Sequence, residues 1–180
     1  VYACAKVLAY VISKFYRETY DMFVTTAIFY NHESPRRPEE YLTRKVTKAV
    51  ARIYAGLQDE LELGDLSAKI DWGYAKEYME AAWSIMQQPK ADDYIICTAE
   101  VHSVQEWVDE CFALVGLDPK KYVKINPKYL RPATTTVLVG DISKAKDAFG
   151  FEPKFKFKEL VRLMLEADLK AVGKTLPATT

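Results

Sequence analysis

The feature that most constrains the fold is a pair of apolar runs, "MFVTTAIFY" at residues 22–30 and "YIICTA" at residues 94–99. The first run is rich in β-branched and aromatic side chains and is too apolar to alternate with polar residues. Apolar runs of this length are typical of strands that are buried on both faces of a parallel sheet. Segments with helical spacing surround them, at 1–20, 43–57, 75–88, 103–115, 143–149 and 157–172. Because strands alternate with helices, the sequence predicts an α/β fold with a parallel sheet.

Shorter signals predict the remaining connections. Residues 31–41 predict a loop because two prolines interrupt them, and residues 64–72 predict a turn-rich connection. Ser103 with Glu106 three residues later is typical of a capping box, which marks the start of a helix. Two further short strands are predicted at 60–63 and 122–126.

Composition excludes several classes of partner. The chain of 180 residues has 25 Lys and Arg against 25 Asp and Glu, so its net charge is zero. Nucleic-acid binding that is driven by bulk charge is therefore not expected. The longest apolar runs fall short of the ~20 residues that a membrane span needs, and we expect no signal peptide, because Arg and Lys do not precede a long apolar block. We expect neither nucleic acid nor membrane among its partners.

The cysteines and histidines are few and scattered along the chain. Cys4, Cys97 and Cys111 form no C-x-x-C pair, and His32 and His102 form no H-x-x-x-H pair, so no metal site is expected. An odd number of cysteines without a disulfide pattern is typical of a reducing compartment. These observations predict a cytoplasmic protein.

The first helix carries a pair of residues that suits proton transfer. Tyr2 and Lys6 stand four residues apart, so both side chains project from one helix face. A nearby ammonium group favours the ionised form of a phenol, which can then move a proton. The pattern Y-x-x-x-K is common, so an exposed helical pair without function remains the alternative.

The segment "NHESPRR" at residues 31–37 follows the first apolar run directly. Side chains that follow a parallel strand face the ligand crevice of an open α/β sheet. The planar guanidinium groups of Arg36 and Arg37 suit phosphate, and Asn31 and His32 can hydrogen-bond a sugar or a cofactor. A solvated loop is the alternative interpretation.

Three further segments contain candidate ligand-binding or structural residues. Lys45, in "TRK", lies near a predicted helix N-terminus, where the helix dipole favours anions. Tyr129 and Arg131 share the short loop "KYLRP", and the arginine is a candidate phosphate clamp. Asp71 and Trp72 precede a helix, which predicts an N-capping carboxylate and a packing ring.

The order of these motifs is more specific than any one of them. Y-x-x-x-K is followed by the first apolar run, and then by "FYNHESPRR", "TRK", "LGDLSAKIDWGYAKEYMEA", "EVHSVQEWVDE", "RP" and "GDISKAKDAFGFEPKFKFKELVRLML". This series resembles the GDP-mannose 4,6-dehydratases, which are extended short-chain dehydrogenase/reductases that act on nucleotide sugars. The resemblance runs from Val1 to about Gly173 and leaves out the end, "TLPATT".

The resemblance implies the C-terminal part of a Rossmann-type doubly wound parallel sheet and a small, mainly helical substrate-binding lobe. Family members open with a glycine-rich phosphate loop, and this chain has none. We therefore expect that the N-terminal half is absent and that the chain is a C-terminal fragment. The expected division is 1–33 and 71–100 for the NADP-binding domain, 34–70 and 101–173 for the nucleotide-sugar lobe, and 174–180 for a tail.

The resemblance also implies roles for single residues. Tyr2 matches the tyrosine that acts as acid and base, and Lys6 matches the lysine that holds the nicotinamide ribose and promotes ionisation of that tyrosine. His32 and Arg37 match residues that contact NADP. Lys45 matches a residue that meets the substrate diphosphate. The positions on the substrate side are Asn31, Lys45, Tyr129 and Arg131.

The implied reaction converts GDP-mannose to GDP-4-keto-6-deoxymannose with bound NADP, as in GDP-fucose biosynthesis. It begins with oxidation at C4, continues with proton loss at C5 and departure of the C6 hydroxyl, and ends with return of the hydride to C6. For the full-length protein the resemblance implies a homodimer or a homotetramer. The chain alone is expected to bind NADP poorly and to be inactive, because the pyrophosphate cradle is missing.

Four positions depart from the family pattern. Ile70 stands where the family usually has Arg before "DW", and Pro38 stands where it usually has Gly. Thr134 and Thr136 take the places of an acidic pair after "RP". Two alternatives therefore stay open: a related nucleotide-sugar epimerase or reductase, and a non-catalytic degenerate paralogue. The first would share the Y-x-x-x-K pair but is not expected to carry "NHESPRR".

Overall fold

The computed structural model describes residues 1–130 and 137–178. Its helices are α1 (Tyr2–Tyr20), α2 (Leu42–Tyr54), α3 (Ala75–Met86), α4 (Val104–Leu114), α5 (Ser143–Phe149) and α6 (Phe157–Ala171), with the 3₁₀ turns η1 (Pro119–Lys121) and η2 (Pro127–Tyr129). Its strands are β1 (Thr26–Phe29), β2 (Asn31–Glu33), β3 (Leu61–Leu63), β4 (Lys69–Ile70), β5 (Trp72–Tyr74), β6 (Asp93–Ile96), β7 (His102–Ser103) and β8 (Val123–Ile125).

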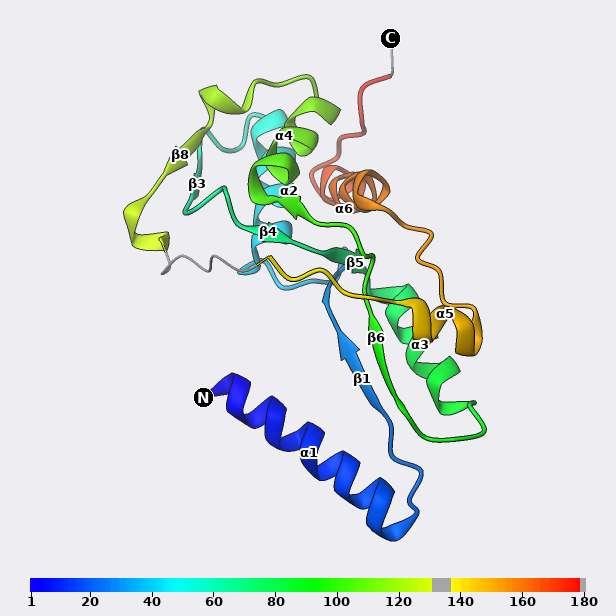
Figure 1. Ribbon diagram of the computed structural model, residues 1–180. Coiled ribbons are helices and arrows are strands. Elements are labelled where there is room, and N and C mark those ends of the chain that lie inside the picture. Colours follow the sequence, from blue (N-terminus) through cyan, green and yellow to red (C-terminus); the bar gives the residue numbers. More distant parts are fainter. Residues whose placement is uncertain (131–136, 179–180) are drawn as a thin grey trace.

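The strands pair mainly in parallel (Figure 1). β1 pairs with β6, β2 pairs with β5 and β3 pairs with β8 in parallel, whereas the short β4 and β7 pair antiparallel. The amide of Tyr30 donates to the carbonyl oxygen of Ile96 at 3.0 Å, which extends the β1–β6 ladder toward β2. Helix α3 leads from β5 to β6 and contacts both β1 and β6, so it packs on the parallel β1–β6 pair. The predicted α/β class with parallel strands is therefore confirmed.

Buried side chains form two clusters in the described residues. The larger cluster lies where α2, α4 and α6 pack on one another and on β3, and it includes Trp72 of β5. The smaller cluster lies between α3, β6 and α5. Its buried members are Tyr78, Ala81, Ile85, Tyr94, Ile96, Ala145 and Phe151. Because β5 adjoins the larger cluster and α3 the smaller one, the β5–α3 connection joins the two parts.

The predicted helices are confirmed, with ends that differ by up to three residues. Ser103 is the N-cap of α4, and its capping box with Glu106 is present. Two sequence predictions were wrong in detail: β2 forms inside the expected loop, and β4 and β5 begin inside the expected turn-rich connection. These strands are two or three residues long, too short for a periodic pattern to reveal them.

Strand β1 is less buried than its apolar sequence predicts. Ile28 is 41% exposed, and no residue of β1 is fully buried. Among the described residues β1 pairs with β6 alone, so its second edge carries no strand. The expectation of burial on both faces is therefore wrong for β1, whereas β6 buries Tyr94 and Ile96.

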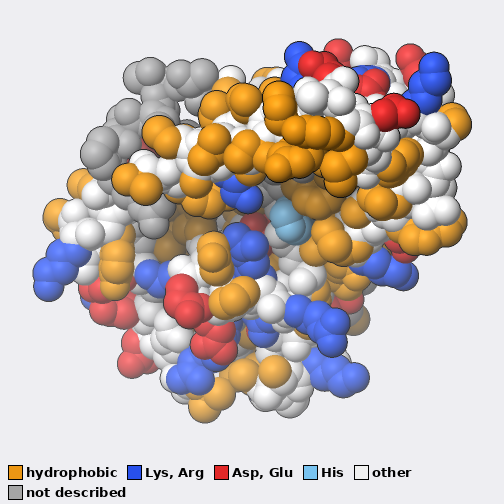
Figure 2. All heavy atoms as spheres, turned by 90° about the horizontal axis from the view of Figure 1, so that it is seen from below, with side chains coloured by type: hydrophobic (Ala, Val, Ile, Leu, Met, Phe, Trp, Pro, Cys, Tyr) orange, Lys and Arg blue, Asp and Glu red, His pale blue; other side chains and the backbone are white. Residues whose placement is uncertain are grey.

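Helix α1 lies apart from both clusters (Figure 1). None of its residues is buried, although large apolar side chains such as Val7, Leu8 and Phe15 lie along it. Figure 2 views the molecule from below and shows hydrophobic side chains gathered across the face seen from that side. Arg17 ties the end of α1 to β6, because its Nη1 and Nη2 atoms donate to the Asp93 carboxylate at 2.8 and 2.7 Å.

No helix in residues 1–130 and 137–178 combines the length and the apolarity that crossing a bilayer requires.

Candidate functional site

The segment "NHESPRR" begins as strand β2 and continues as a turn. His32 is fixed at its Nδ1 atom, which lies 2.9 Å from the carbonyl oxygen of Tyr30. A carbonyl oxygen only accepts, so Nδ1 donates and Nε2 of the neutral ring is left as an acceptor. The imidazole also packs against the rings of Phe29 and Tyr78, at centroid distances of 5.6 and 5.3 Å. The ring orientation of His32 is therefore set by both backbone and aromatic neighbours.

Arg37 is held beside a buried carboxylate. Its Nε atom lies 3.4 Å from Glu33 Oε2, and its guanidinium carbon lies 3.6 Å from the centre of the Tyr41 ring. Among the described residues, Arg37 Nε has no hydrogen-bond partner. Thr43 Oγ1 donates to the same Glu33 oxygen at 2.7 Å. Burial raises the pKa of Glu33, while the Thr43 hydroxyl and the Arg37 charge act in the opposite direction.

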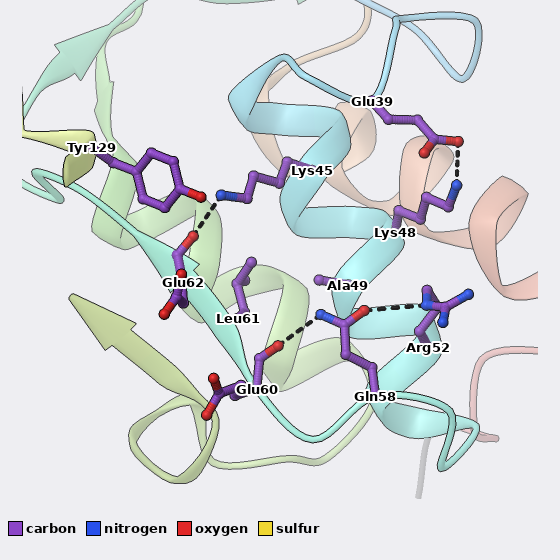
Figure 3. Close-up of a pocket in the computed structure, with 10 residues that line it drawn as sticks. All are labelled: Glu39, Lys45, Lys48, Ala49, Arg52, Gln58, Glu60, Leu61, Glu62 and Tyr129. Carbon is purple, nitrogen blue, oxygen red and sulfur yellow. Dashed lines mark hydrogen bonds and ion pairs between the residues drawn. The ribbon is translucent and has the colours of Figure 1, made fainter. Parts of the chain in front are cut away.

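Helix α2 places Lys45 in an open pocket of about 530 Å³ between α2, β3 and η2 (Figure 3). Lys45 Nζ donates to the carbonyl oxygen of Glu62 at 2.6 Å and lies 4.2 Å from the centre of the Tyr129 ring. The structure therefore brings two predicted substrate residues, Lys45 and Tyr129, together. The pocket is lined by Glu39, Lys45, Lys48, Ala49, Arg52, Gln58, Glu60, Leu61, Glu62 and Tyr129.

The wall of this pocket depends on a close backbone approach. A Cβ atom on Gly64 would lie 2.4 Å from the carbonyl oxygen of Tyr129, so only glycine fits there without displacement. The other cations of the pocket are engaged by neighbours: Lys48 pairs with Glu39, and Arg52 Nε donates to Gln58 Oε1 at 3.2 Å. Lys45 is the cation that projects toward the aromatic ring (Figure 3).

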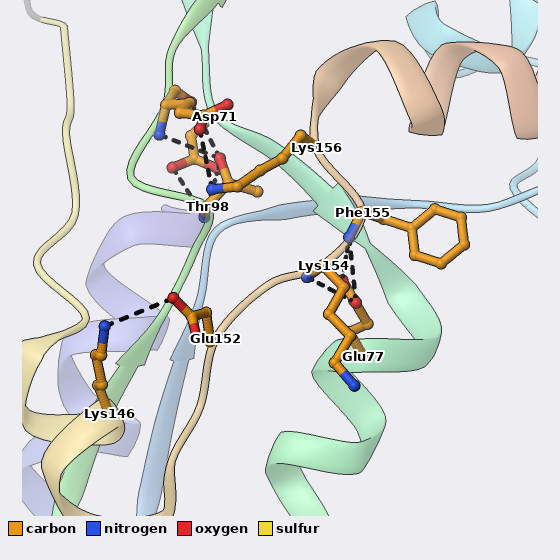
Figure 4. A network of polar contacts seen from close by, with 9 residues as sticks. Asp71, Glu77, Thr98, Lys146, Glu152, Lys154, Phe155 and Lys156 are labelled. Atoms are coloured by element: carbon orange, nitrogen blue, oxygen red, sulfur yellow. Dashed lines mark hydrogen bonds and ion pairs between the residues drawn. The ribbon is translucent and has the colours of Figure 1, made fainter.

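Asp71 does not cap α3, contrary to the sequence prediction. The N-cap of α3 is Tyr74, and the buried Asp71 carboxylate instead accepts from Thr98 (Figure 4). Thr98 follows β6 and Asp71 precedes β5, so this contact links the ends of two strands. Ala99, the next residue, has φ 60°, a conformation that a non-glycine residue rarely adopts. The packing role predicted for Trp72 is confirmed by its contact with Trp107, at 5.1 Å between ring centroids.

Tyr2 and Lys6 lie one turn apart on the exposed face of α1. Lys6 Nζ lies 5.5 Å from the centre of the Tyr2 ring, and Tyr2 is 77% exposed. The predicted proximity of the two side chains is therefore present. Figure 1 shows that the N-terminal end of α1 is well separated from the α2–η2 region.

The remaining candidate residues have varied surroundings. Asn31 is exposed and pairs in the β2–β5 ladder with Trp72. Arg131 lies outside the described residues, as do Thr134 and Thr136. Ile70 is half-buried and packs against the larger cluster.

Three residues that sequence reasoning did not assign also shape this region. Glu33 and Thr43 form the buried contact beside Arg37, and Arg44 lies next to them in "TRK". Their residue types do not predict these contacts, because each contact depends on how the loop folds back on α2.

The two buried cysteines do not offer a nucleophile, whereas Cys4 is exposed on α1. Burial raises the pKa of Cys97 to about 11 and raises the pKa of the fully buried Cys111 as well. Both side chains are therefore neutral thiols at physiological pH. Within the described residues, no three His, Cys, Asp or Glu side chains gather in a way that could hold a metal ion.

Solved structures with the same architecture are similar over almost the whole chain. RMD from Pseudomonas aeruginosa, complexed with NADPH, matches with a TM-score of 0.84 at 20% identity, covering 94% of this chain and 56% of that one. A dTDP-glucose 4,6-dehydratase from Bacillus anthracis, in complex with NAD, matches with a TM-score of 0.81 at 21% identity, covering 94% and 52%. Together with the parallel strand pairs, these matches define the chain as part of a Rossmann-type α/β protein.

Sequence comparison gives the family. The GDP-mannose 4,6 dehydratase family model matches residues 1–164. GDP-mannose 4,6 dehydratase 2 of Arabidopsis thaliana is 47% identical over 169 residues, which cover 94% of this chain and 45% of that protein. The human GDP-mannose 4,6 dehydratase is 40% identical over 186 residues, which cover 94% and 50%. This chain belongs to the GDP-mannose 4,6 dehydratase family and spans about half the length of these curated relatives.

Proposed function

We propose that the protein containing this chain is a lyase that converts GDP-mannose to GDP-4-keto-6-deoxymannose with NADP as its cofactor. The observation that carries the proposal is the pairing of Tyr2 and Lys6 on one helix face, in a chain of the GDP-mannose 4,6 dehydratase family. The activity is assigned to the full-length protein, because the chain covers about half of its relatives. The fragment alone is proposed to be inactive.

Tyr2 and Lys6 are the proposed catalytic residues. Tyr2 takes the proton of the sugar hydroxyl at C4, which allows a carbonyl to form there. Lys6 holds the nicotinamide ribose beside the ring of Tyr2. The 5.5 Å between Lys6 Nζ and the Tyr2 ring centre supports this pairing.

His32 and Arg37 are the proposed cofactor contacts from the loop. Arg37 offers a planar cation whose side chain is 26% exposed, and a guanidinium group suits a phosphate. His32 offers Nε2 on a ring already fixed by the Tyr30 carbonyl. When bound, the dinucleotide supplies the hydride acceptor and donor. We propose NADP rather than NAD because the extra phosphate suits the two guanidinium groups of "SPRR".

The substrate is proposed to lie along Asn31, Lys45, Tyr129 and Arg131. Lys45 is a mobile point charge that can exchange the Glu62 carbonyl for the diphosphate, and the half-exposed Tyr129 ring can support an apolar face of the ligand. The two buried clusters support a cofactor part and a substrate part, except that Ala145 and Phe151 pack in the smaller cluster and Trp72 packs in the larger one. We propose 1–33 and 71–100 for the first and 34–70 and 101–173 for the second, with 174–180 as a tail.

We propose the cellular compartment, the pathway and the oligomeric state from the same family. The full-length protein is expected to act in the cytoplasm, in GDP-fucose biosynthesis, as a homodimer or a homotetramer. Sedimentation of the full-length protein at several concentrations checks the oligomeric state. A monomer at all concentrations would contradict this part of the proposal.

The deciding experiment uses the protein expressed with any coding sequence that adjoins this chain. GDP-mannose and NADP are supplied, and the product is analysed for a 4-keto-6-deoxy sugar. Tyr2→Phe removes the hydroxyl and is expected to lower kcat by a factor on the order of 10²–10⁴. Tyr10→Phe is the matched control, because Tyr10 lies on the same helix and has no proposed role.

The outcomes separate the remaining candidates. No product from a protein that still binds NADPH would contradict the dehydratase proposal. Turnover of a different nucleotide sugar, supplied in place of GDP-mannose, would favour a related epimerase or reductase. Equal turnover by the Tyr2→Phe variant would exclude Tyr2 as the acid and base.

One observation favours the second candidate, a non-catalytic copy. Ile70 packs its hydrocarbon side chain on the larger cluster, at the end of β4 where the family usually places a cation. Ile70→Arg tests whether that cation matters in this protein. A gain in kcat/KM of tenfold or more would show that the natural residue weakens substrate binding.

A further inference from the structure

Asp168 is a buried charge at the C-terminal end of α6. It is 2% exposed and lies in the last turn of the helix, where the helix dipole disfavours an anion. Burial of a carboxylate adds a second cost, which must be offset by well-placed partners. Asp168 also lies beyond residues 1–164, which match the family model. A residue that is unfavourable on both counts requires compensating contacts.

Those contacts all come from helix α2. Arg44 Nη2 lies 2.7 Å from Asp168 Oδ1, and Arg44 Nε donates to the same oxygen at 3.1 Å. Thr47 Oγ1 donates to Asp168 Oδ2 at 2.7 Å. The carboxylate therefore fixes one edge of a guanidinium group whose side chain is 16% exposed.

The other edge of this guanidinium reaches the cofactor loop. Arg44 Nη1 donates to the carbonyl oxygen of Pro35. Inside the loop, the amide of Arg37 donates to the carbonyl oxygen of Ser34 at 2.9 Å, which closes a turn around Pro35. The Glu33–Thr43 contact anchors only the strand that precedes this turn. Arg44 thus ties Pro35, within the turn, to the helical core, in addition to the contacts that Arg37 makes with Glu33 and Tyr41.

We infer that Asp168 is a positioning residue for the loop at residues 34–37. A guanidinium group is planar and rigid, so the carboxylate that fixes one edge also fixes the direction of the other edge. Asp168 therefore orients Arg44, and Arg44 fixes the position of the turn that carries Arg36 and Arg37. That the loop binds a dinucleotide rests on the proposed function; that Asp168 positions the loop does not.

The test uses trypsin on the protein expressed with any adjoining coding sequence. Trypsin cleaves after Arg36, which is exposed, and does not cleave the bond from Arg37 to Pro38. Asp168→Asn removes the charge that orients Arg44. Arg44→Lys keeps the buried carboxylate paired but cannot reach both partners, so it tests the loop even if the first variant fails to fold. Both variants are expected to be cleaved at this bond about tenfold faster than the natural protein.

Two controls isolate the loop from general instability. Thr47→Val removes a hydrogen bond to Asp168 but leaves Arg44 in place, so cleavage after Arg36 should stay within twofold. Glu166→Gln breaks an exposed pair on the same helix and should change nothing. Cleavage of Arg44→Lys at the natural rate would overturn the inference, as would equal acceleration by Thr47→Val.

A second arm separates this inference from the proposed function. NADPH is added to the natural protein before trypsin, and protection of the Arg36–Arg37 bond is measured. Acceleration in Arg44→Lys without protection by NADPH would support the positioning role and count against dinucleotide binding by the loop. Protection by NADPH without acceleration in Arg44→Lys would support dinucleotide binding by the loop and count against the positioning role. The NADPH concentration for half-protection should rise about tenfold in Arg44→Lys.

Discussion

Thr98 clamps the carboxylate of Asp71 with two donors. Its hydroxyl donates to Asp71 Oδ1 at 2.7 Å, and its amide donates to the same oxygen at 3.0 Å. Both side chains are buried. The contact joins the end of β6 to the start of β5. It therefore links a strand that borders the smaller cluster to a strand that borders the larger one.

Thr98→Val should destabilise the protein by about 1–3 kcal/mol, because it leaves a buried carboxylate without one of its donors. Urea denaturation measures the change in the free energy of unfolding. Thr98→Ser keeps the hydroxyl and is expected to cost less than half as much. No loss in Thr98→Val would contradict the prediction, and equal losses from both substitutions would show that the methyl group contributes as much as the hydrogen bond.

Tyr78→Phe should leave stability unchanged or raise it by up to about 1 kcal/mol. Tyr78 is fully buried, and its hydroxyl has no hydrogen-bond partner in the described part of the chain. The ring itself packs on His32 and Phe29 and is kept in the variant. Thermal denaturation of Tyr78→Phe and of Tyr78→Leu separates the contribution of the hydroxyl to stability from that of the aromatic ring. A loss above 2 kcal/mol in the phenylalanine variant would reveal a partner for the hydroxyl.

The Arg17–Asp93 pair predicts a defined dependence of stability on pH. The hydrogen bond from Arg17 holds the pKa of Asp93 below its usual value, despite partial burial. A folded pKa below the unfolded one contributes stability above the unfolded pKa of about 3.9 and loses it as pH falls through the folded value. Asp93→Asn should therefore lower the free energy of unfolding at pH 7, and the difference should vanish in acid. Glu18→Gln, in an exposed pair on the same helix, is the control.

A constant difference between the natural protein and Asp93→Asn from pH 7 to pH 2.5 would contradict the prediction. It would mean that the geometry of the side chain, rather than its charge, accounts for the contact. Because Arg17 is near the end of α1, hydrogen exchange in that helix reports the same pair locally. Faster exchange in α1 of the variant at pH 7 is expected.

The helices were predictable from the sequence because their signals are local. The capping box of Ser103 and Glu106 lies within four residues, and helical apolar spacing covers a few turns. Strand β2 was missed because its three residues, Asn31–Glu33, are polar or charged. It becomes a strand through pairing with Trp72–Tyr74, and no local pattern contains that partner.

The candidate site was predictable in its residues but not in its contacts. Lys45 and Tyr129 were both chosen, yet only the fold brings the ammonium over the ring. Asp71 was misassigned because a carboxylate just before a helix looks like a cap, whereas its actual partner lies 27 residues later. Asp168 gave no signal, since its contact with Arg44 spans 124 residues of sequence. Contacts between distant buried polar groups follow from packing, which sequence spacing does not describe.

Gly64→Ala should damage the pocket that contains Lys45. The new Cβ would lie 2.4 Å from the carbonyl oxygen of Tyr129, so η2 must shift and carry the Tyr129 ring with it. Overpacking of this kind costs about 1–3 kcal/mol of stability. If the pocket binds the nucleotide sugar, KM for that substrate should rise about tenfold while kcat changes little, because Tyr2 is untouched. Gly116→Ala is the matched control: its Cβ would meet nothing within 4 Å, but its φ of +69° makes alanine strained. Gly116→Ala should therefore lower stability without raising KM, and a rise in KM from both variants would remove the pocket from the substrate path.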